Sequence, residues 1–423
     1  MKGSVTRWAR RSIGIFDAGI SSIGNLAVSI AAARALSLDD FGLVSVTVLT
    51  GIITVGVARS FWGDPFTLHS SGLAASERAR DATQAVTSAC ATTLLVAPLI
   101  GAIVTAVALL SGADSWTAFA LGASLAAVAP LLILQDVARQ ISYGTDRPVS
   151  ALGNTVAWTA ILVAALAVPL ATGRALPSWL YVLFWGMTAG LGAAVGFALL
   201  RIMPRLANPL PWIRQHAKLV RRLVSDYALT QVTSETSIVL ISILAGAAEA
   251  GLIRKAQIPL APLVIMTSGI IAVTQPALVR RVAGGAGLPE LRRFAYQLGF
   301  ACIALSLMLG LAVAAVPESF MQHLVGHDWA QARVLVPILA LYLGLGALAA
   351  CQGITLRAFD RIGEQVRLRL ILLPVILVAV ASGASFGALT AAVALCVSLL
   401  SVCLAWAALL ARPAPSEQEP VTQ

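Results

Sequence analysis

Long apolar segments alternate with short polar ones along the whole chain, and the apolar segments are long enough to cross a membrane. About 20 predominantly apolar residues span the hydrocarbon core of a bilayer as an α-helix. The pattern predicts twelve such spans, most of them separated by short connections. The predicted boundaries are 12–33, 41–62, 84–110, 116–138, 150–170, 179–201, 223–246, 252–275, 294–315, 332–350, 366–381 and 384–410.

Two of the predicted spans carry a regular stripe of polar side chains. Polar residues at intervals of three or four share one face of a helix. A charged group near the centre of a membrane helix is costly, so such a face usually meets a protein interior or a wet cavity. The stripe of the first span is Asp17, Ser21, Asn25 and Ser29, and that of the seventh is Asp226, Thr230, Ser234 and Ser237.

The two stripes occupy equivalent places in the two halves of the chain. Gly42 lies 25 positions after Asp17, and Gly251 lies 25 positions after Asp226. Repeats of this kind are typical of transporters whose two halves line one path. The sequence therefore predicts an all-α polytopic membrane protein with about twelve transmembrane helices, in two six-helix lobes related by an internal repeat.

The boundaries of these lobes follow from a proline-rich and basic segment in the middle of the chain. We expect an N-terminal lobe at 1–202, a basic cytoplasmic linker at 203–222 and a C-terminal lobe at 223–411. Part of the linker is expected to form a short basic amphipathic helix on the membrane. The polar, proline-rich tail at 412–423 is expected to be disordered and cytoplasmic.

Composition and charge support a membrane protein and exclude an ordinary soluble domain. Hydrophobic residues make up 58% of the chain and charged residues 11%, with a mean hydropathy of +0.88, whereas soluble domains have about 25% charged residues. On one predicted side of the membrane lie 24 of the 29 lysines and arginines. This asymmetry places both termini in the cytoplasm, in a cell (cytoplasmic) membrane.

The formal net charge of +10 indicates which partners the chain attracts. Its basic residues are spread over membrane-proximal loops without interleaved aromatic residues. Anionic membrane lipids are therefore the expected partners, and nucleic acid is not.

Motifs of enzymes, metal sites and nucleotide-driven pumps are missing from the sequence. No nucleotide-binding loop, nucleophile elbow or paired metal-ligand motif occurs, and the five cysteines all fall in apolar segments. His323 and His327 stand at helical spacing, but the surrounding residues favour an interfacial turn of helix over a metal site. We expect a protein that is not an enzyme and has neither a cofactor nor a metal site.

A few charged residues interrupt the predicted spans. Arg254 and Lys255 begin the eighth span and would suit a diphosphate, or else extend to the outer interface. Glu235 lies near the middle of the seventh span as a possible counter-ion, protonation switch or structural group. Asp17 stands near the cytoplasmic end of the first span, where it could instead cap the helix.

Three short segments resemble bacterial polysaccharide flippases, which belong to the multidrug/oligosaccharidyl-lipid/polysaccharide exporter superfamily. The opening ARALSLDDFGLVSV matches the pattern of that family at Arg34, Leu36, Phe41 and Gly42. QDVARQISYGTDRP and ITLRAFDRIG are similar to the segments that follow its fourth and tenth helices. The chain departs from the family in having twelve rather than fourteen predicted spans.

The resemblance implies a transporter that flips a polyprenyl-diphosphate-linked oligosaccharide, of the kind used for O-antigen, teichoic acid or exopolysaccharide repeats. It implies alternating access from the cytoplasmic to the outer leaflet, during polysaccharide biosynthesis or export. A glycan polymerase or glycosyltransferases are the implied protein partners. Such a cargo needs a polar path, because diphosphates and sugar hydroxyls are costly to bury without partners.

We assign candidate roles to nine residues on this basis. Arg254, Lys255 and Arg59 are expected to hold the diphosphate, and Glu235 or Asp17 to couple transport to protons or to the membrane potential. Three alternatives remain: a cation-coupled multidrug exporter of the same superfamily, a membrane-embedded glycan polymerase or transferase, and a scaffold without transport activity. The residues expected to meet the sugar hydroxyls are Asn25, Ser29, Ser234 and Ser237.

Overall fold

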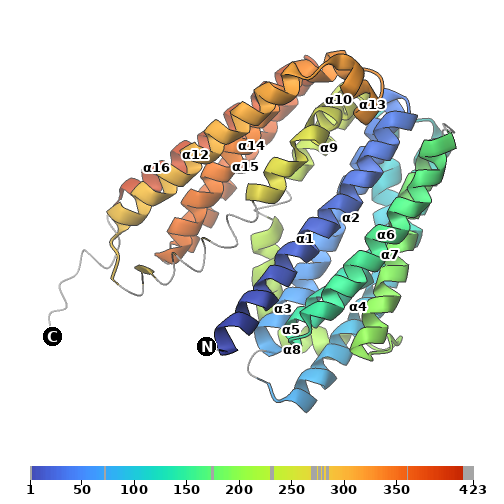
Figure 1. The fold of residues 1–423 in the computed structure, drawn as a ribbon, viewed down its shortest axis with the longest axis vertical. Helices are drawn as coiled ribbons and strands as arrows, with labels where there is room; N and C mark the ends of the chain where they lie inside the picture. Colours follow the sequence, from blue (N-terminus) through green and yellow to red (C-terminus); the bar gives the residue numbers. More distant parts are fainter. Residues whose placement is uncertain are drawn as a thin grey trace. The chain divides into compact units, whose positions relative to one another are not determined.

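Helices make up all the regular structure in the described part of the chain (Figure 1). The computed structural model describes residues 2–70, 73–172, 176–228, 233–267, 274, 278, 281–282, 285–359 and 361–412. The packing of the helices divides the chain into two compact units, Met1–Gly251 and Leu252–Gln423. Each unit is described separately below.

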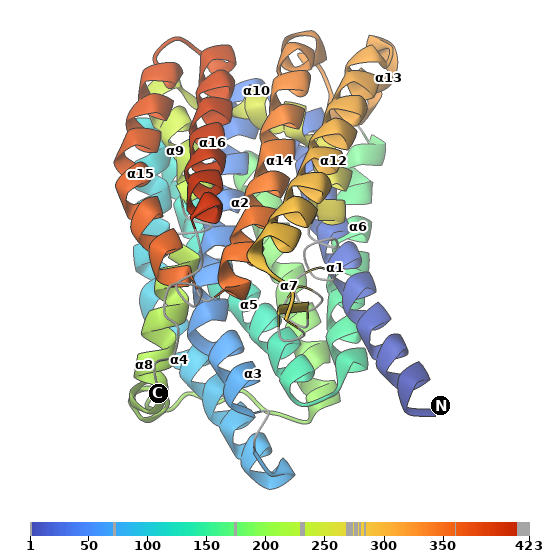
Figure 2. The ribbon, with the colours of Figure 1, turned by 90° about the vertical axis from the view of Figure 1, so that its left-hand side faces the viewer.

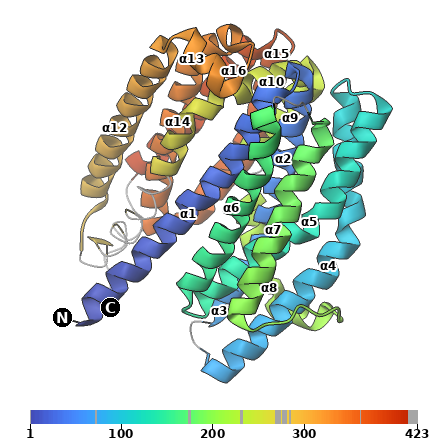
Figure 3. The ribbon, with the colours of Figure 1, turned by 45° about the vertical axis from the view of Figure 1, so that its right-hand side comes forward.

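The first unit is built from long helices that pack side by side. In Figure 3, α4, α5 and α7 run alongside one another, and α1 and α6 form a further packed pair. A short π-helical turn, η1, continues α2 into α3. The elements are α1 Lys2–Ala35, α2 Leu38–Ala58, η1 Arg59–Gly63, α3 Asp64–Ser70, α4 Ala75–Leu110, α5 Ser115–Gly144, α6 Pro148–Thr172, α7 Ser178–Leu200, α8 Leu210–Tyr227 and α9 Thr233–Ala245.

Among the elements whose bounds the structure describes, the second unit contains four long helices and three shorter elements. Figure 2 shows α14 running beside α12 and α16, with α15 on the far side of α16. The buried ring of Trp406 lies in the core that α14 and α16 share. Helix α10 (Ala247–Gln257) contributes its residues from Leu252 onward. The other elements are η3 Ile258–Leu260, α12 Leu288–Ala315, α13 Glu318–Val325, α14 Trp329–Ala358, α15 Ile362–Ala384 and α16 Ala388–Ala411.

Ten described helices are long and apolar enough to span a membrane. They coincide with ten of the twelve predicted spans and confirm the expected fold class, an all-α multi-pass membrane protein. The predicted spans 223–246 and 252–275 differ from the structure. The first begins inside α8 and continues in α9, and the second covers part of α10 and η3; both predictions include residues outside the described ranges.

The segment ARALSLDDFG forms the end of α1, the turn and the start of α2, and its polar residues cap α2. Ser37 caps α2 by accepting a hydrogen bond of 3.2 Å from the amide of Asp40. The negative Asp40 carboxylate lies in the first turn of α2, where it interacts favourably with the positive end of the helix dipole. Phe41 is fully buried directly after the cap. The motif behind the family resemblance is therefore a helix-capping turn in this chain.

The two repeat glycines meet where α2 crosses α10. A Cβ atom on Gly251 would lie 2.7 Å from the Leu38 carbonyl oxygen and 3.3 Å from the Cα of Gly42. A Cβ atom on Gly42 would overlap the backbone carbonyl of Ala247. Only glycine allows the two backbones to approach so closely. The two glycines that occupy equivalent positions in the two halves of the sequence thus lie at one helix crossing.

The predicted span 179–201 contains overlapping GxxxG pairs, a motif that favours close helix packing. On α7, Gly186 and Gly190 face Val128 and Leu131 of α5. On the same helix, Gly192 and Gly196 face a residue of α6, Asn154. Small residues on both sides let α7 lie close to two neighbours at once.

The predicted basic linker is largely helical and packs onto the first unit. In α8, Trp212, His216 and Val220 are buried, whereas Arg214 and Lys218 are exposed. Trp212 and Val220 join a core that includes Trp62 and Phe66. The apolar face of α8 is therefore covered by protein. The expected position of this basic helix on the membrane stays a prediction.

The compact units do not coincide with the predicted domains. Because α8 and α9 pack within the first unit, that unit extends to Gly251, beyond the predicted linker at 203–222. The lobe boundaries at 1–202 and 223–411 stay a prediction about the repeat. Residues 413–423 of the predicted disordered tail lie outside the described residues.

Candidate functional site

Charged side chains from three helical elements converge in the first unit. Asp17 comes from α1 and Arg59 from η1, while α5 contributes Asp136, Arg139 and Tyr143. These five residues are called the charge network below. Both aspartates are almost completely buried. Because an isolated buried charge is very costly, the network must pair its acids and bases to be stable.

Arg59 and Asp136 form the strongest link in the charge network. The Arg59 Nε donates to Asp136 Oδ2 at 2.9 Å, and Arg59 Nη2 donates to Asp136 Oδ1 at 2.6 Å. Two parallel bonds of this kind fix the plane of the guanidinium. The Asp136 side chain is 4% exposed and that of Arg59 is 38% exposed. Arg59 therefore forms the accessible end of the network.

Arg139 connects this pair to Asp17. Its Nη2 lies 3.7 Å from Asp136 Oδ1, and its Nε lies 3.5 Å from Asp17 Oδ2. The Tyr143 hydroxyl donates to the same Asp17 oxygen at 2.6 Å. The other carboxylate oxygen, Asp17 Oδ1, is buried and has no hydrogen-bond partner among the described residues. Asp17 thus retains capacity to accept a proton or a cation.

The position of Asp17 corrects one alternative for this residue. The first helix begins at Lys2, not near residue 12, so Asp17 lies well inside α1 and does not cap it. A carboxylate in a helix interior needs partners from other helices, and α5 supplies them. The assignment of Asp17 as a coupling residue stays a prediction.

The polar stripe of α1 faces the interior of the first unit. Ser21 Oγ accepts a 3.3 Å bond from Arg139, and Asn25 Oδ1 accepts a 3.0 Å bond from the indole of Trp185 on α7. Ser29 donates to the backbone oxygen of Asn25 at 3.1 Å. Asn25 and Ser29 are half-buried. The stripe continues the charge network along α1 toward α7.

The second stripe is described only in part. Ser237 is buried on α9, and Glu235 is half-buried. The side chains of Asp226, Thr230 and Ser234 lie outside the described residues. The ring of Tyr227 at the end of α8 is close enough to both Arg59 and Glu235 to interact with their charges. A Cβ atom on Gly56 would overlap this ring, so Tyr227 packs one turn before Arg59.

In the second unit, the structure separates the environments of Arg254 and Lys255. Lys255 is fully buried; its Nζ donates to the His327 carbonyl at 2.7 Å and to Asp328 Oδ2 at 3.3 Å. Lys255 therefore lies inside the protein, bound to the connection that precedes α14, and its assignment to a diphosphate stays a prediction. Arg254 is half-buried and donates to Gln257 at 3.0 Å. Lys255 holds α10 against the start of α14, whereas Arg254 lies beside it on α10.

The second unit has a surface groove lined by basic, polar, aromatic and small apolar residues. Its volume is about 580 Å³, and it lies between α12 and α16. Two arginines and two aromatic rings would suit an anionic headgroup above an apolar tail. The expected partnership with anionic membrane lipids stays a prediction. The lining residues are Pro289, Arg292, Arg293, Tyr296, Gln297, Phe300, Ala407 and Ala411.

Sequence reasoning missed three members of the charge network. Asp136, Arg139 and Tyr143 lie in the segment QDVARQISYGTDRP, which was noted for its resemblance and not for its chemistry. Their spacing on α5 was the available signal, because residues three and four apart share a helical face. The partner of Lys255 was also missed, since Asp328 is 73 residues away.

Solved transporter structures share this fold, although neither a family model nor a curated protein sequence matches the chain. An inward-facing multidrug resistance MATE family transporter has a TM-score of 0.64 and 16% identity, covering 95% of this chain and 96% of that chain. The lipid II flippase MurJ, in an inward closed conformation, has a TM-score of 0.65 and 10% identity, covering 97% and 88%. A transporter from Pyrococcus furiosus has a TM-score of 0.54 and 15% identity, covering 95% of each chain. The chain has the fold of the MOP-superfamily transporters.

The MOP-superfamily fold agrees with the superfamily that the short sequence motifs resemble. At these identities the likeness concerns the fold alone, and one fold serves several functions. A MATE multidrug transporter and a lipid II flippase both have it. The cargo of this chain must therefore be argued from its own residues.

Proposed function

We propose that this protein is a membrane transporter that flips a polyprenyl-diphosphate-linked oligosaccharide from the cytoplasmic to the outer leaflet. It works by alternating access in the cell membrane, with both termini in the cytoplasm. It serves polysaccharide biosynthesis or export, beside a glycan polymerase or glycosyltransferases. The observation that carries this proposal is the half-exposed Arg59, held in place by the buried carboxylate of Asp136.

Arg59 has the properties of a prepared site for an anion. A guanidinium has five N–H donors in a fixed plane and stays charged in a protein. The bonds to Asp136 use Nε and one terminal nitrogen, so donors remain on the exposed part of the group. Because Asp136 fixes its orientation, little side-chain entropy is lost when an anion binds. A diphosphate is the anionic group of the proposed cargo.

The charge network also gives a physical route from binding to movement. A diphosphate oxygen competes with Asp136 for Arg59. If Arg59 turns toward the diphosphate, Arg139 remains beside both Asp136 and Asp17. The arriving cargo thus changes which base neutralises which acid, and α1, η1 and α5 are the elements that respond. A ligand shifts a conformational equilibrium only through such differential contacts.

Arg254 is the better candidate of the neighbouring pair on α10. The Lys255 side chain is only 1% exposed, so it offers no accessible donor to a cargo. Arg254 is half-buried and is the base that we assign to the diphosphate in the second unit. Asn25, Ser29, Ser234 and Ser237 retain their proposed role toward sugar hydroxyls, and Glu235 its proposed role in coupling.

One observation favours a second candidate function, a cation-coupled multidrug exporter. Asp17 is buried and has an oxygen without a hydrogen-bond partner among the described residues. A carboxylate in this state can bind a proton or a metal cation and release it as the protein changes conformation. This function requires a site that prefers cationic cargo, whereas the accessible end of the network is the cation Arg59.

Ligand binding to the purified intact protein separates the two functions. The probes are a short-chain polyprenyl diphosphate and the lipophilic cation tetraphenylphosphonium, measured by calorimetry in nanodiscs. We expect the diphosphate to bind more tightly. Arg59→Gln should weaken that binding about 10-fold or more, because a charged hydrogen bond contributes about 1.5–3 kcal/mol.

Two further variants control this experiment. Arg59→Lys keeps the positive charge and should weaken binding less than Arg59→Gln. Arg333→Gln removes an exposed arginine at the start of α14 and should leave binding unchanged. Binding of the cation but not of the diphosphate would contradict the proposed cargo and support the exporter.

A further inference from the structure

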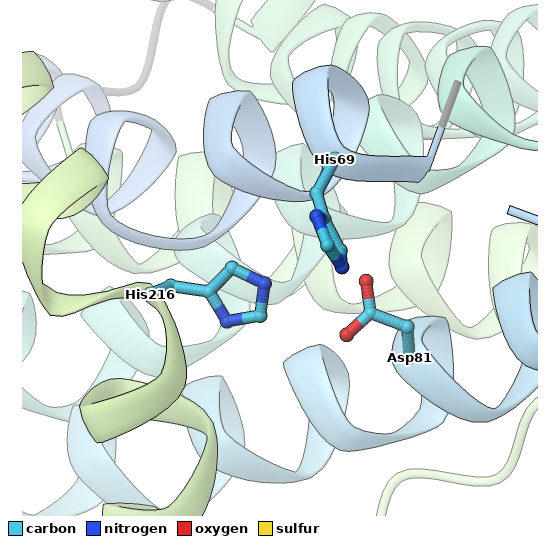
Figure 4. Close-up of side chains that lie close together, drawn as sticks. All are labelled: His69, Asp81 and His216. Atoms are coloured by element: carbon cyan, nitrogen blue, oxygen red, sulfur yellow. The ribbon is translucent and has the colours of Figure 1, made fainter. Parts of the chain in front are cut away.

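Three side chains outside the charge network point toward one another in the first unit. His69 comes from α3, Asp81 from α4 and His216 from α8. Each offers a ligand atom, and these atoms all lie within 4.8 Å of one another. Figure 4 shows the two imidazole rings and the carboxylate directed at a common point. Residues 69, 81 and 216 are brought together only by the folded structure.

The carboxylate of Asp81 is buried next to the two imidazole rings. The residue is 6% exposed, and neither Oδ1 nor Oδ2 has a hydrogen-bond partner among the described residues. Burying an ionised carboxylate without compensation is very unfavourable. A positive charge at the common point would remove this penalty.

His216 presents an unused ring nitrogen to the same point. It is 5% exposed, and its Nδ1 lies 3.1 Å from the Trp212 carbonyl oxygen. A carbonyl oxygen only accepts hydrogen bonds, so Nδ1 carries a proton and donates it. Nε2 is buried with no partner among the described residues, and in the neutral ring it holds a lone pair. A histidine that donates one N–H to a backbone carbonyl is the usual arrangement of a metal ligand.

The neighbouring rings fix the geometry of the two histidines. The His216 ring stacks on Trp212 with centroids 4.3 Å apart, and Trp212 is 2% exposed in the core of the unit. His69 meets His216 edge to face at 5.1 Å. His69 is itself exposed and provides a path from solvent. The site is thus rigid on the α8 side and accessible on the α3 side.

We propose that His69, Asp81 and His216 bind one divalent transition-metal ion of the Zn²⁺ class. Two imidazoles and one carboxylate suit a tetrahedral ion whose fourth ligand is water. With ordinary bond lengths, donor atoms around such an ion lie about 3.4 Å apart. The observed spread of up to 4.8 Å closes to this value by small side-chain rotations, chiefly of the exposed His69.

Metal binding at this point would fasten α8 to α3 and α4. The exposed face of α8 carries basic residues, among them Arg214 and Lys218. A bound ion adds ligand bonds to the apolar packing that already holds this helix. The ion would therefore stabilise the first unit and protect α8 from proteolysis.

Metal content of the purified full chain tests the site, after any affinity tag is removed. The chain has only four histidines, so the controls are complete. After dialysis against Zn²⁺, we expect one bound ion per chain by mass spectrometry. The variant His69→Gln/His216→Gln should lose the ion, and the matched control His323→Gln/His327→Gln should keep it.

Two independent readouts accompany the stoichiometry. Co²⁺ in place of Zn²⁺ should give the visible absorption of a tetrahedral site, and Asp81→Asn should abolish it without removing a histidine. In wild type, a chelator should speed tryptic cleavage at Arg214 and Lys218, and added Zn²⁺ should reverse this. Equal Zn²⁺ content in the two double variants, or no Zn²⁺ in wild type, overturns the proposal.

Discussion

Asp136→Leu is expected to lower the free energy of unfolding by about 3–5 kcal/mol, because removing one partner of a buried ion pair leaves the others uncompensated. Asp136 accepts two hydrogen bonds from Arg59 and lies beside Arg139. Without it, the buried Arg139 keeps Asp17 as an acidic neighbour, and Arg59 loses both hydrogen bonds to its carboxylate partner. Unfolding by SDS titration in mixed micelles measures the change.

A double-mutant cycle separates the pair from a general packing defect. Arg59→Met/Asp136→Leu removes both charges and should cost clearly less than the sum of the single changes. The pair of Arg78 and the exposed Asp146, 3.4 Å apart, supplies the control, and Asp146→Asn should cost about 1 kcal/mol or less. A single-variant cost for Asp136→Leu no larger than that of the control would contradict a buried charge network.

Gly42→Ala should destabilise the protein by about 2 kcal/mol or more, because the new Cβ overlaps the Ala247 backbone carbonyl where α2 crosses α10. Overpacking typically lowers stability by about 3 kcal/mol at most. The higher helix propensity of alanine offsets about 1 kcal/mol of this loss. The obstructing atoms belong to the backbone, which cannot turn aside as a side chain can. The two helices must move apart. Thermal unfolding in detergent measures the loss.

Gly19→Ala is the matched control for this crossing. Gly19 lies inside α1, and a Cβ there would meet nothing within 4 Å. The same chemical change should therefore raise stability, by up to about 1 kcal/mol. Equal effects at Gly19 and Gly42 would show that the close approach of α2 and α10 has been misjudged.

The fold class could be predicted from the sequence because membrane spans are local. Each apolar run satisfies its own backbone hydrogen bonds, and its length matches the bilayer. The two predicted spans whose bounds differ from the described helices share one property, which is polar or proline-interrupted sequence. Residues 223–246 start within the amphipathic α8, and Pro259 ends the regular part of α10. Neither segment carries a long uniform apolar signal.

The candidate site could be predicted only where its members recur on one helix. The α1 stripe from Asp17 to Ser29 has a helical period, and its inward orientation is confirmed by the bonds to Arg139 and Trp185. The pairing of Arg59 with Asp136 joins residues 77 positions apart. No periodicity connects them, because helix packing chooses which helices meet.

The cluster of His69, Asp81 and His216 was beyond sequence reasoning for the same reason. Two of its members flank one short connection, and the third lies on a helix that was expected to rest on the membrane. The three residues meet because α8 packs through Trp212 and Val220 onto the first unit. The expectation of no metal site considered only residues that are close in sequence.

Transbilayer movement of cargo by the purified protein tests the central claim most directly. Proteoliposomes would contain a labelled polyprenyl-diphosphate oligosaccharide, and an impermeant quencher would report how much label changes leaflet. We expect the wild-type protein to move the label, Arg59→Gln to move it about 10-fold more slowly or worse, and Arg333→Gln to match wild type. No movement by the wild-type protein, with or without an imposed proton gradient and membrane potential, would contradict the claim.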